Sequence, residues 1–206
     1  MHRILIFTWC IYFTGVNAAN KILQSELYNN KGIWYNINTS SPFNGIAYKY
    51  DENANALVQQ TNYIDGIEWG KYYEWWPSGI KKIDGKFRNG LMHGRWKFFN
   101  EKGKIYCAGS YMKGEGHKPT HLIKKIPTDG RRGLWTYWDE NGRKIEEGYL
   151  SINGTAKGNW SFWDKNGKKR LGKKINYDTF NNKDALKHLD GYFLVSGLEN
   201  DLNSTY

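Results

Sequence analysis

Hydrophobic and polar residues alternate in four ten-residue segments that align from glycine to glycine without gaps. The segments are 70–79, 94–103, 133–142 and 158–167. An aromatic residue stands two places after each opening glycine, and another stands five places after it. The first set is Tyr72, Trp96, Trp135 and Trp160, and the second is Trp75, Phe99, Trp138 and Trp163. Because side chains alternate between the two faces of a strand, this pattern predicts β-strands with an aromatic ladder on each face.

Each segment carries two turn signals. A polar run closes on glycine, as at Asn141-Gly142, and an Asn-Gly or Asp-Gly pair such as Asn89-Gly90 precedes the next unit. Such pairs between alternating apolar residues are the strongest short-range hairpin signal. The unit is therefore a β-hairpin, with starts near 45, 70, 94, 133 and 158. Short links make successive hairpins neighbours, which predicts an all-β, elongated antiparallel meander of consecutive hairpins.

The domain limits follow from this repeat. Residues 19–41 are an N-terminal lead-in, 42–172 are the hairpin array with an insertion at 115–132, and 173–206 are a C-terminal extension. The first hairpin has Ala54 in place of the closing glycine, which weakens its turn signal. In the extension we expect a short helix at 183–190 and a strand or docking segment at 192–195, covering the open end of the sheet.

Composition agrees with this fold. The chain has 206 residues, among them ten Trp, fifteen Tyr, nine Phe and 23 Gly. So much aromatic surface excludes a disordered chain, a collagen or a coiled coil. Most of the glycines are expected at turns and junctions, and most of the aromatics at ladder positions.

The first eighteen residues have the pattern of an export signal. A basic start is followed by an apolar run and by Val16-Asn17-Ala18, where small residues occupy the positions that a signal peptidase reads. We expect cleavage after Ala18 and an exported product in the periplasm, on the cell surface or secreted, with no transmembrane segment. The alternative is a buried N-terminal strand or helix. Cleavage would leave Cys107 as the remaining cysteine, which we interpret as a small buried hydrophobe rather than an intermolecular bridge.

The unit beginning Asn89-Gly90-Leu91-Met92-His93-Gly94-Arg95-Trp96 resembles the bacterial variant of the MORN repeat. The resemblance covers about residues 42 to 172, and the array's entry, Pro42-Phe43-Asn44-Gly45, is similar too. It implies a sheet of hairpin repeats of the antitoxin-like, YwqK type, and protein-binding or membrane-apposed relatives in eukaryotes. It implies no catalytic residues. Choline-binding wall repeats are a rival resemblance, but they have a shorter period and a recurrent Thr-Gly-Trp that is absent here.

The ladders have two interpretations. Aromatic neighbours on adjacent hairpins can bury one another, because a single-layer sheet has no other core. Alternatively, one ladder lines an exposed groove for a partner. The aromatic candidates for partner binding are Tyr72, Tyr73, Trp75, Trp76, Trp96, Trp135 and Trp160, and the first four are expected to occupy both faces.

Charge is concentrated in the array. Residues 77–174 carry 23 Lys or Arg against nine acidic residues, whereas the segments on either side are slightly acidic. A charge run is usually a solvated face, but it also suits an anionic partner such as membrane headgroups, an envelope polymer or an acidic protein. The basic candidates for partner binding are Lys124, Lys125, Arg131 and Arg132. Export disfavours nucleic acid.

No pattern for catalysis or for a cofactor is visible. His117 and His121 lie four residues apart, but Pro119 argues against a helix between them and no further ligand completes a zinc set. The run from Asp139 to Gly142 superficially resembles a calcium loop, and we interpret it as a hairpin turn. The sequence thus predicts an exported, non-catalytic protein-interaction module without a cofactor or metal. An antitoxin-like or immunity-like role is one option for this module. The alternative is association with an envelope or membrane surface through a basic, aromatic-rich sheet face.

Overall fold

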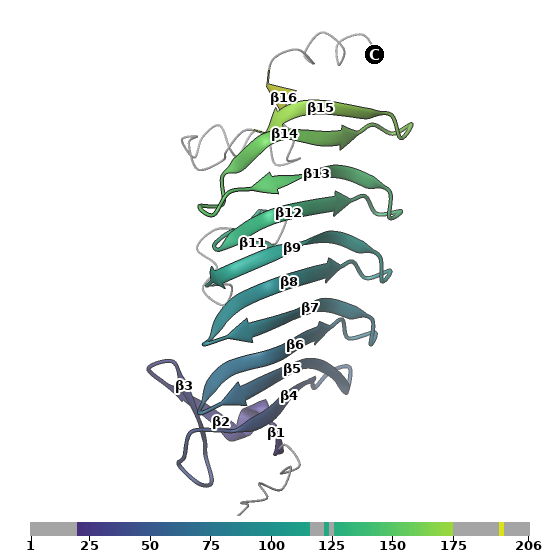
Figure 1. The fold of residues 1–206 in the computed structure, drawn as a ribbon. Coiled ribbons are helices and arrows are strands. Elements are labelled where there is room, and N and C mark those ends of the chain that lie inside the picture. The colour runs from purple at the N-terminus through teal and green to yellow at the C-terminus, as the bar shows by residue number, and fades with distance from the viewer. Residues whose placement is uncertain (1–19, 116–121, 124–125, 175–193, 196–206) are drawn as a thin grey trace, which may run out of the picture.

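The protein is one long sheet whose strands follow one another in sequence order (Figure 1). The computed structural model describes residues 20–115, 122–123, 126–174 and 194–195. The main sheet contains β1 (Lys21–Leu23), β4 (Gly45–Asp51), β5 (Ala56–Ile64), β6 (Ile67–Trp75), β7 (Lys81–Arg88), β8 (Leu91–Phe99), β9 (Ile105–Gly114), β12 (Arg131–Trp138), β13 (Lys144–Leu150), β14 (Ala156–Trp163), β15 (Lys169–Lys174) and β16 (Leu194–Val195). All neighbours from β4 to β16 are antiparallel, so the predicted all-β meander is confirmed.

Smaller elements flank this sheet. Strand β1 pairs in parallel with β4, after which a 3₁₀ turn, η1 (Gln24–Glu26), leads into the hairpin of β2 (Leu27–Asn30) and β3 (Ile33–Asn36). A second small hairpin, β10 (Leu122–Ile123) with β11 (Ile126–Pro127), belongs to the insertion. Despite that insertion, β9 pairs directly with β12. The array therefore continues across it.

Each predicted unit is one hairpin of the array: β4–β5, β6–β7, β8–β9, β12–β13 and β14–β15. In three of the hairpin turns an Asn or Asp side chain accepts hydrogen bonds from the backbone N–H groups two and four residues later. The closing glycine then takes a left-handed conformation, as Gly142 does with φ 82°. In the first hairpin Asn55, with φ 46°, adopts this conformation one residue after Ala54, so the turn forms without glycine.

The face that carries Tyr72, Trp96, Trp135 and Trp160 is here called the ladder face. Across the strands, Tyr72 lies opposite Gly85, Trp96 opposite Gly109, and Trp135 opposite Gly148. Each indole also covers the glycine of the preceding hairpin, because a Cβ at Gly85, Gly109 or Gly148 would overlap Trp96, Trp135 or Trp160. None of these three glycines has a positive φ. They are required by the close approach of an indole, not by a turn.

The rings of the ladder face form a continuous core. Phe87 and Tyr111 contact Trp96 with ring centroids 5.3 and 5.9 Å apart, and Tyr111 contacts Trp135 at 5.2 Å. Trp96 is 2% exposed, while Trp135 and Trp160 are fully buried. This arrangement follows the prediction that neighbouring hairpins bury each other's aromatics. A second cluster near the N-terminus unites Leu27, Phe43, Ala47 and Tyr63.

The insertion returns to the array on the ladder face. Ile126 is fully buried in the main core, and the Tyr111 hydroxyl donates to the Pro127 carbonyl at 2.6 Å. Cys107 is buried in β9, in agreement with its predicted role as a small hydrophobe. The end of the insertion therefore contributes to the core.

Several predicted features lie outside the described residues. They are the signal segment 1–18, His117, His121, Lys124, Lys125 and the helix at 183–190. In the expected 192–195 segment, Leu194 and Val195 do form a strand, which pairs with Lys173 and Lys174.

Candidate binding face

The three tryptophans of the ladder, proposed from sequence as partner-binding residues, lie within the core. Their burial removes Trp96, Trp135 and Trp160 from the accessible surface, since each is covered by rings or backbone of adjacent hairpins. Tyr72 packs with them, and its hydroxyl hydrogen-bonds the Glu74 carboxylate. Burial, followed by the charge of Glu74, raises the pKa of Tyr72 far above its usual value. These aromatics serve the fold.

The remaining aromatics of the Tyr72–Trp76 cluster are half-buried. The ring centroids of Tyr73 and Trp75 are 5.7 Å apart, and the Lys81 ammonium lies 4.5 Å from the centroid of the Tyr73 ring. Trp76 donates from its indole nitrogen to the Phe99 carbonyl at 3.3 Å. Since Tyr73 and Trp75 alternate with Tyr72, the cluster occupies both faces of the sheet as predicted. Its rings are engaged with neighbouring side chains and backbone.

The face opposite the ladder is here called the basic face. It carries a line of five cationic side chains. Each follows or precedes in sequence a residue that packs on the ladder face, so the cation itself points to the opposite face. We call this line the basic row, and it consists of Lys71, Lys86, Arg95, Arg132 and Lys157. Lys71 is directly opposite Lys86, while Arg95 and Arg132 both pair with Ser110 of the strand between them. Tyr149 pairs with Lys157, which extends the line to β14.

Nothing in the described part of the chain neutralises the basic row. Arg132 is half-buried and the other four side chains are exposed, and none of the five forms an ion pair with a described residue. The carboxylates Asp84 and Glu147 share the basic face, but they pair with Lys81 at 3.1 Å and Lys144 at 2.8 Å. The acidic groups on this face are therefore already compensated, whereas the row is not.

The environment of Glu147 shows this compensation directly. Its carboxylate accepts hydrogen bonds from Lys144 at 2.8 Å and from the Thr136 hydroxyl at 2.9 Å. Burial alone would raise the pKa of Glu147, but the two hydrogen bonds and the nearby lysines outweigh it and hold the pKa below its usual value. Glu147 is thus ionised and satisfied within the sheet.

His93 reports the positive potential at the margin of the row. Its pKa is lowered, first by burial and then by the charges of Arg88, Lys86 and Arg132. Three cations acting on one imidazole indicate that their fields overlap at this end of the strands. The region is a positive surface rather than a set of isolated charges.

Two exposed apolar side chains stand in line with the row. Leu134 and Tyr149 are directly opposite each other, and they are 38% and 56% exposed. Because Tyr149 pairs in turn with Lys157, the ring lies next to a cation of the row. This part of the face therefore combines positive charge with an accessible aromatic ring.

The structure separates two arginines that the sequence groups together. Arg131 points into the core, where its guanidinium donates to the Tyr137 hydroxyl at 3.1 Å and to the Thr128 carbonyl at 3.3 Å. It also stacks 5.3 Å from the Trp135 ring centroid. Arg132 points to the opposite face and joins the basic row. Arg131 is therefore structural, and only Arg132 of this pair is placed to meet a partner.

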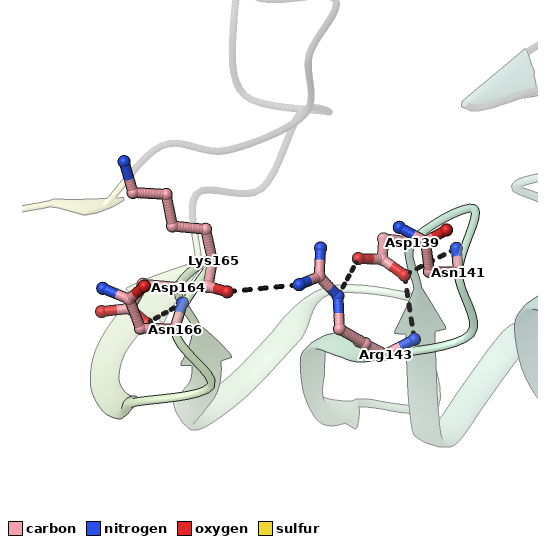
Figure 2. Close-up of polar contacts among 6 residues, drawn as sticks. All are labelled: Asp139, Asn141, Arg143, Asp164, Lys165 and Asn166. Carbon is pink, nitrogen blue, oxygen red and sulfur yellow. Dashed lines mark hydrogen bonds and ion pairs between the residues drawn. The ribbon is translucent and has the colours of Figure 1, made fainter.

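Neighbouring hairpin turns are linked at the other end of the strands (Figure 2). Arg143 pairs with Asp139 at 2.7 Å and donates to the Lys165 carbonyl of the next hairpin at 3.3 Å. Asp139 also accepts from the backbone of Arg143 and Asn141, and these bonds hold its pKa below its usual value. The Asp139 carboxylate is thus the organiser of a hairpin turn, as its sequence context predicted.

Two further observations bear on the type of site. Within the ranges that the structure describes, no cluster of three or more His, Cys, Asp or Glu side chains is arranged to hold a metal ion. In the same ranges, no helix has the length and apolar character needed to span a membrane.

Comparison with known proteins assigns no family to the chain. No protein-family model matches the chain, and no curated protein does. The crystal structure of a GtfA/B complex bound to UDP and GlcNAc aligns with a TM-score of 0.27 and 13% identity, covering 50% of this chain and 22% of that chain. The crystal structure of TarM aligns with a TM-score of 0.27 and 10% identity, covering 71% and 21%. The chain spans about a fifth of the length of either, and neither likeness is close enough to indicate its function.

Proposed function

We propose that this protein is an exported, non-catalytic interaction module that binds an anionic partner through the basic face of its sheet. The observation that carries the proposal is the basic row, five cations aligned across the strands without a described carboxylate partner. Aligned like charges repel one another, so they destabilise the free protein slightly and favour a bound anion.

The division of labour between the two faces supports this proposal. The aromatic side chains of the ladder face are buried in the core, so they stabilise the fold. On the basic face, by contrast, four of the five cations of the row are exposed, and the carboxylates Asp84 and Glu147 are already paired with lysines. An acidic protein, as in an antitoxin-like or immunity-like complex, and an anionic envelope surface both fit this description. Export rests on the sequence pattern of the first eighteen residues.

The function is tested with two baits, the mature wild-type protein and a variant with Lys71, Lys86 and Arg95 changed to Gln. Each is incubated with the exported proteins and the envelope fraction of the source organism. We expect the wild type alone to retain a partner, and to release it at about 1 M salt, where the Debye length is about 3 Å. Equal retention by the two baits, or a catalytic turnover abolished by one point mutation, would contradict the proposal.

A further inference from the structure

The basic row runs along the long axis of the molecule. Figure 1 shows the strands stacked one after another along that axis, and the row crosses them from β6 to β14. Seven consecutive strands, β6-β7-β8-β9-β12-β13-β14, are involved. With about 4.8 Å between neighbouring strands, the backbone positions of the row span about 29 Å.

The charges are distributed rather than convergent. Lys71, Lys86 and Arg95 stand on adjacent strands, while Arg132 and Lys157 each follow after one intervening strand. A single small anion reaches one or two of these side chains. A ligand that neutralises all five has to be extended, and it has to carry negative charge repeatedly along its length.

The neighbouring lines of residues attract an anionic chain less than the row does. On the side toward the hairpin turns, Asp84 and Glu147 occupy the next position along their strands. Both carboxylates are paired with lysines, and Lys97 lies directly opposite Asp84, so this line offers an anionic chain no run of unpaired cations. On the other side lie Arg88 and His93, within the positive potential already described. The favourable path for an anionic chain is therefore lengthwise, along the row.

Resting on the proposed function above, we propose that the anionic partner is a linear acidic polysaccharide laid across the strands along the basic row. Tyr149 favours this class over an extended polyanion without apolar rings, such as polyphosphate. Its ring is 56% exposed and lies beside Lys157, where it can pack against the apolar face of a sugar ring. Leu134 opposite adds apolar surface. A chain of phosphates has no such face to offer, and a globular acidic protein matches a row of charges this long less closely than an extended chain does.

The test uses oligogalacturonates of increasing length with the full chain, and measures affinity by calorimetry. We expect the affinity to rise with oligomer length until the oligomer spans the row. For longer oligomers, the affinity calculated for each binding site should stay constant. The fully methyl-esterified oligomer, which has lost its charges, should not bind. The change of both Lys86 and Arg95 to Glu should weaken binding by about tenfold or more, because two charge contacts are reversed.

Two matched variants separate the contributions. Lys102→Glu with Lys165→Glu reverses the same number of charges at exposed hairpin turns away from the row. This double variant should bind with an affinity within about twofold of the wild type, because salt screens charges that lie further from the ligand than the Debye length of about 8 Å. Tyr149→Ala should weaken binding of the oligogalacturonate but not of a poly-glutamate peptide of equal charge. Thermal unfolding confirms that each variant is folded.

The outcomes discriminate between the two proposals. Length-independent binding, or an equal effect of Tyr149→Ala on both ligands, overturns the polysaccharide assignment while leaving an anionic partner in place. Tighter binding of poly-glutamate than of oligogalacturonate does the same and points to an acidic protein. Absence of binding to both polyanions, or binding indifferent to the row variants, overturns the assignment together with the proposed function.

Discussion

The indole of Trp135 lies over Gly109, so closely that a single methyl group on that glycine would overlap the ring. The same relationship joins Trp96 to Gly85 and Trp160 to Gly148. It places a large ring and a residue without a side chain at the last three junctions between hairpins of the array. The packing of the sheet depends on both partners, and this can be measured.

Gly109→Ala should destabilise the protein by about 1–3 kcal/mol, because overpacking a core forces side chains or backbone to move. Chemical denaturation followed by tryptophan fluorescence measures the change. Ser110→Ala, on the next residue and the opposite face, is the control and should stay within about 0.5 kcal/mol of the wild type. Equal stability of Gly109→Ala and wild type would contradict the close contact.

Trp135→Ala should cost about 3–5 kcal/mol, the range for removing a buried aromatic side chain. Trp138→Ala, only three residues along the same strand but half-buried on the basic face, should cost distinctly less. Comparison of the two unfolding midpoints tests which face supplies the core. If Trp138→Ala lowered the stability more than Trp135→Ala does, the core would lie on the basic face and not on the ladder face.

Glu147 should make stability depend on pH. Its folded pKa is lowered, so its contribution is present above its unfolded pKa, near 4.5, and is lost as the pH falls through the folded value. Glu147→Gln should therefore be less stable than the wild type at neutral pH, and this difference should shrink in acid. Urea unfolding at several pH values measures it. A difference that is constant with pH would mean that the ionised carboxylate contributes nothing through Lys144.

The imidazole of His93 should respond to the cations around it. Because the charges of Arg88, Lys86 and Arg132 help to lower its pKa, Arg132→Gln should raise that pKa, and so should a bound polyanion. Titration followed by NMR of the His93 ring gives both values. The distant change Lys165→Gln is the control and should leave the titration unchanged. An unaltered His93 pKa in Arg132→Gln would show that the positive fields do not overlap.

The hairpins could be located from sequence because their signals are local. Gly-to-Gly spacing and the aromatic positions recur in every unit, and turns depend on residues close in the chain. Even the first hairpin formed where Ala54 weakened the signal, since Asn55 also tolerates a left-handed conformation. Strand pairing then followed from short links.

The glycines beneath the tryptophans were interpreted too narrowly. Turn and junction roles account for most array glycines, but Gly85, Gly109 and Gly148 are in extended strands. A signal for them was present, because each follows the aromatic opposite it by thirteen residues. Only the register of the strands shows that this spacing brings ring and glycine together.

The basic row was missed for a different reason. Sequence runs such as Arg131-Arg132 attract notice, yet neighbouring residues of a strand point to opposite faces. Arg131 is accordingly in the core, and the runs do not mark a surface. The residues that do align, such as Lys86 and Arg95, come from different strands, and their alignment depends on register and on bulges at glycines such as Gly94.

The Trp–Gly junctions also give the array a direction. The third and fourth hairpins each offer an indole to the hairpin before them and a glycine to the hairpin after them, so these two hairpins are interchangeable at their borders. A chain from which β12 and β13 were excised would bring Gly109 to Trp160, the same kind of junction as before. The N-terminal border differs, because there Tyr72 meets Thr61 instead of a glycine. Whole hairpins can thus be gained or lost within the array, and the length of the basic row would change with them.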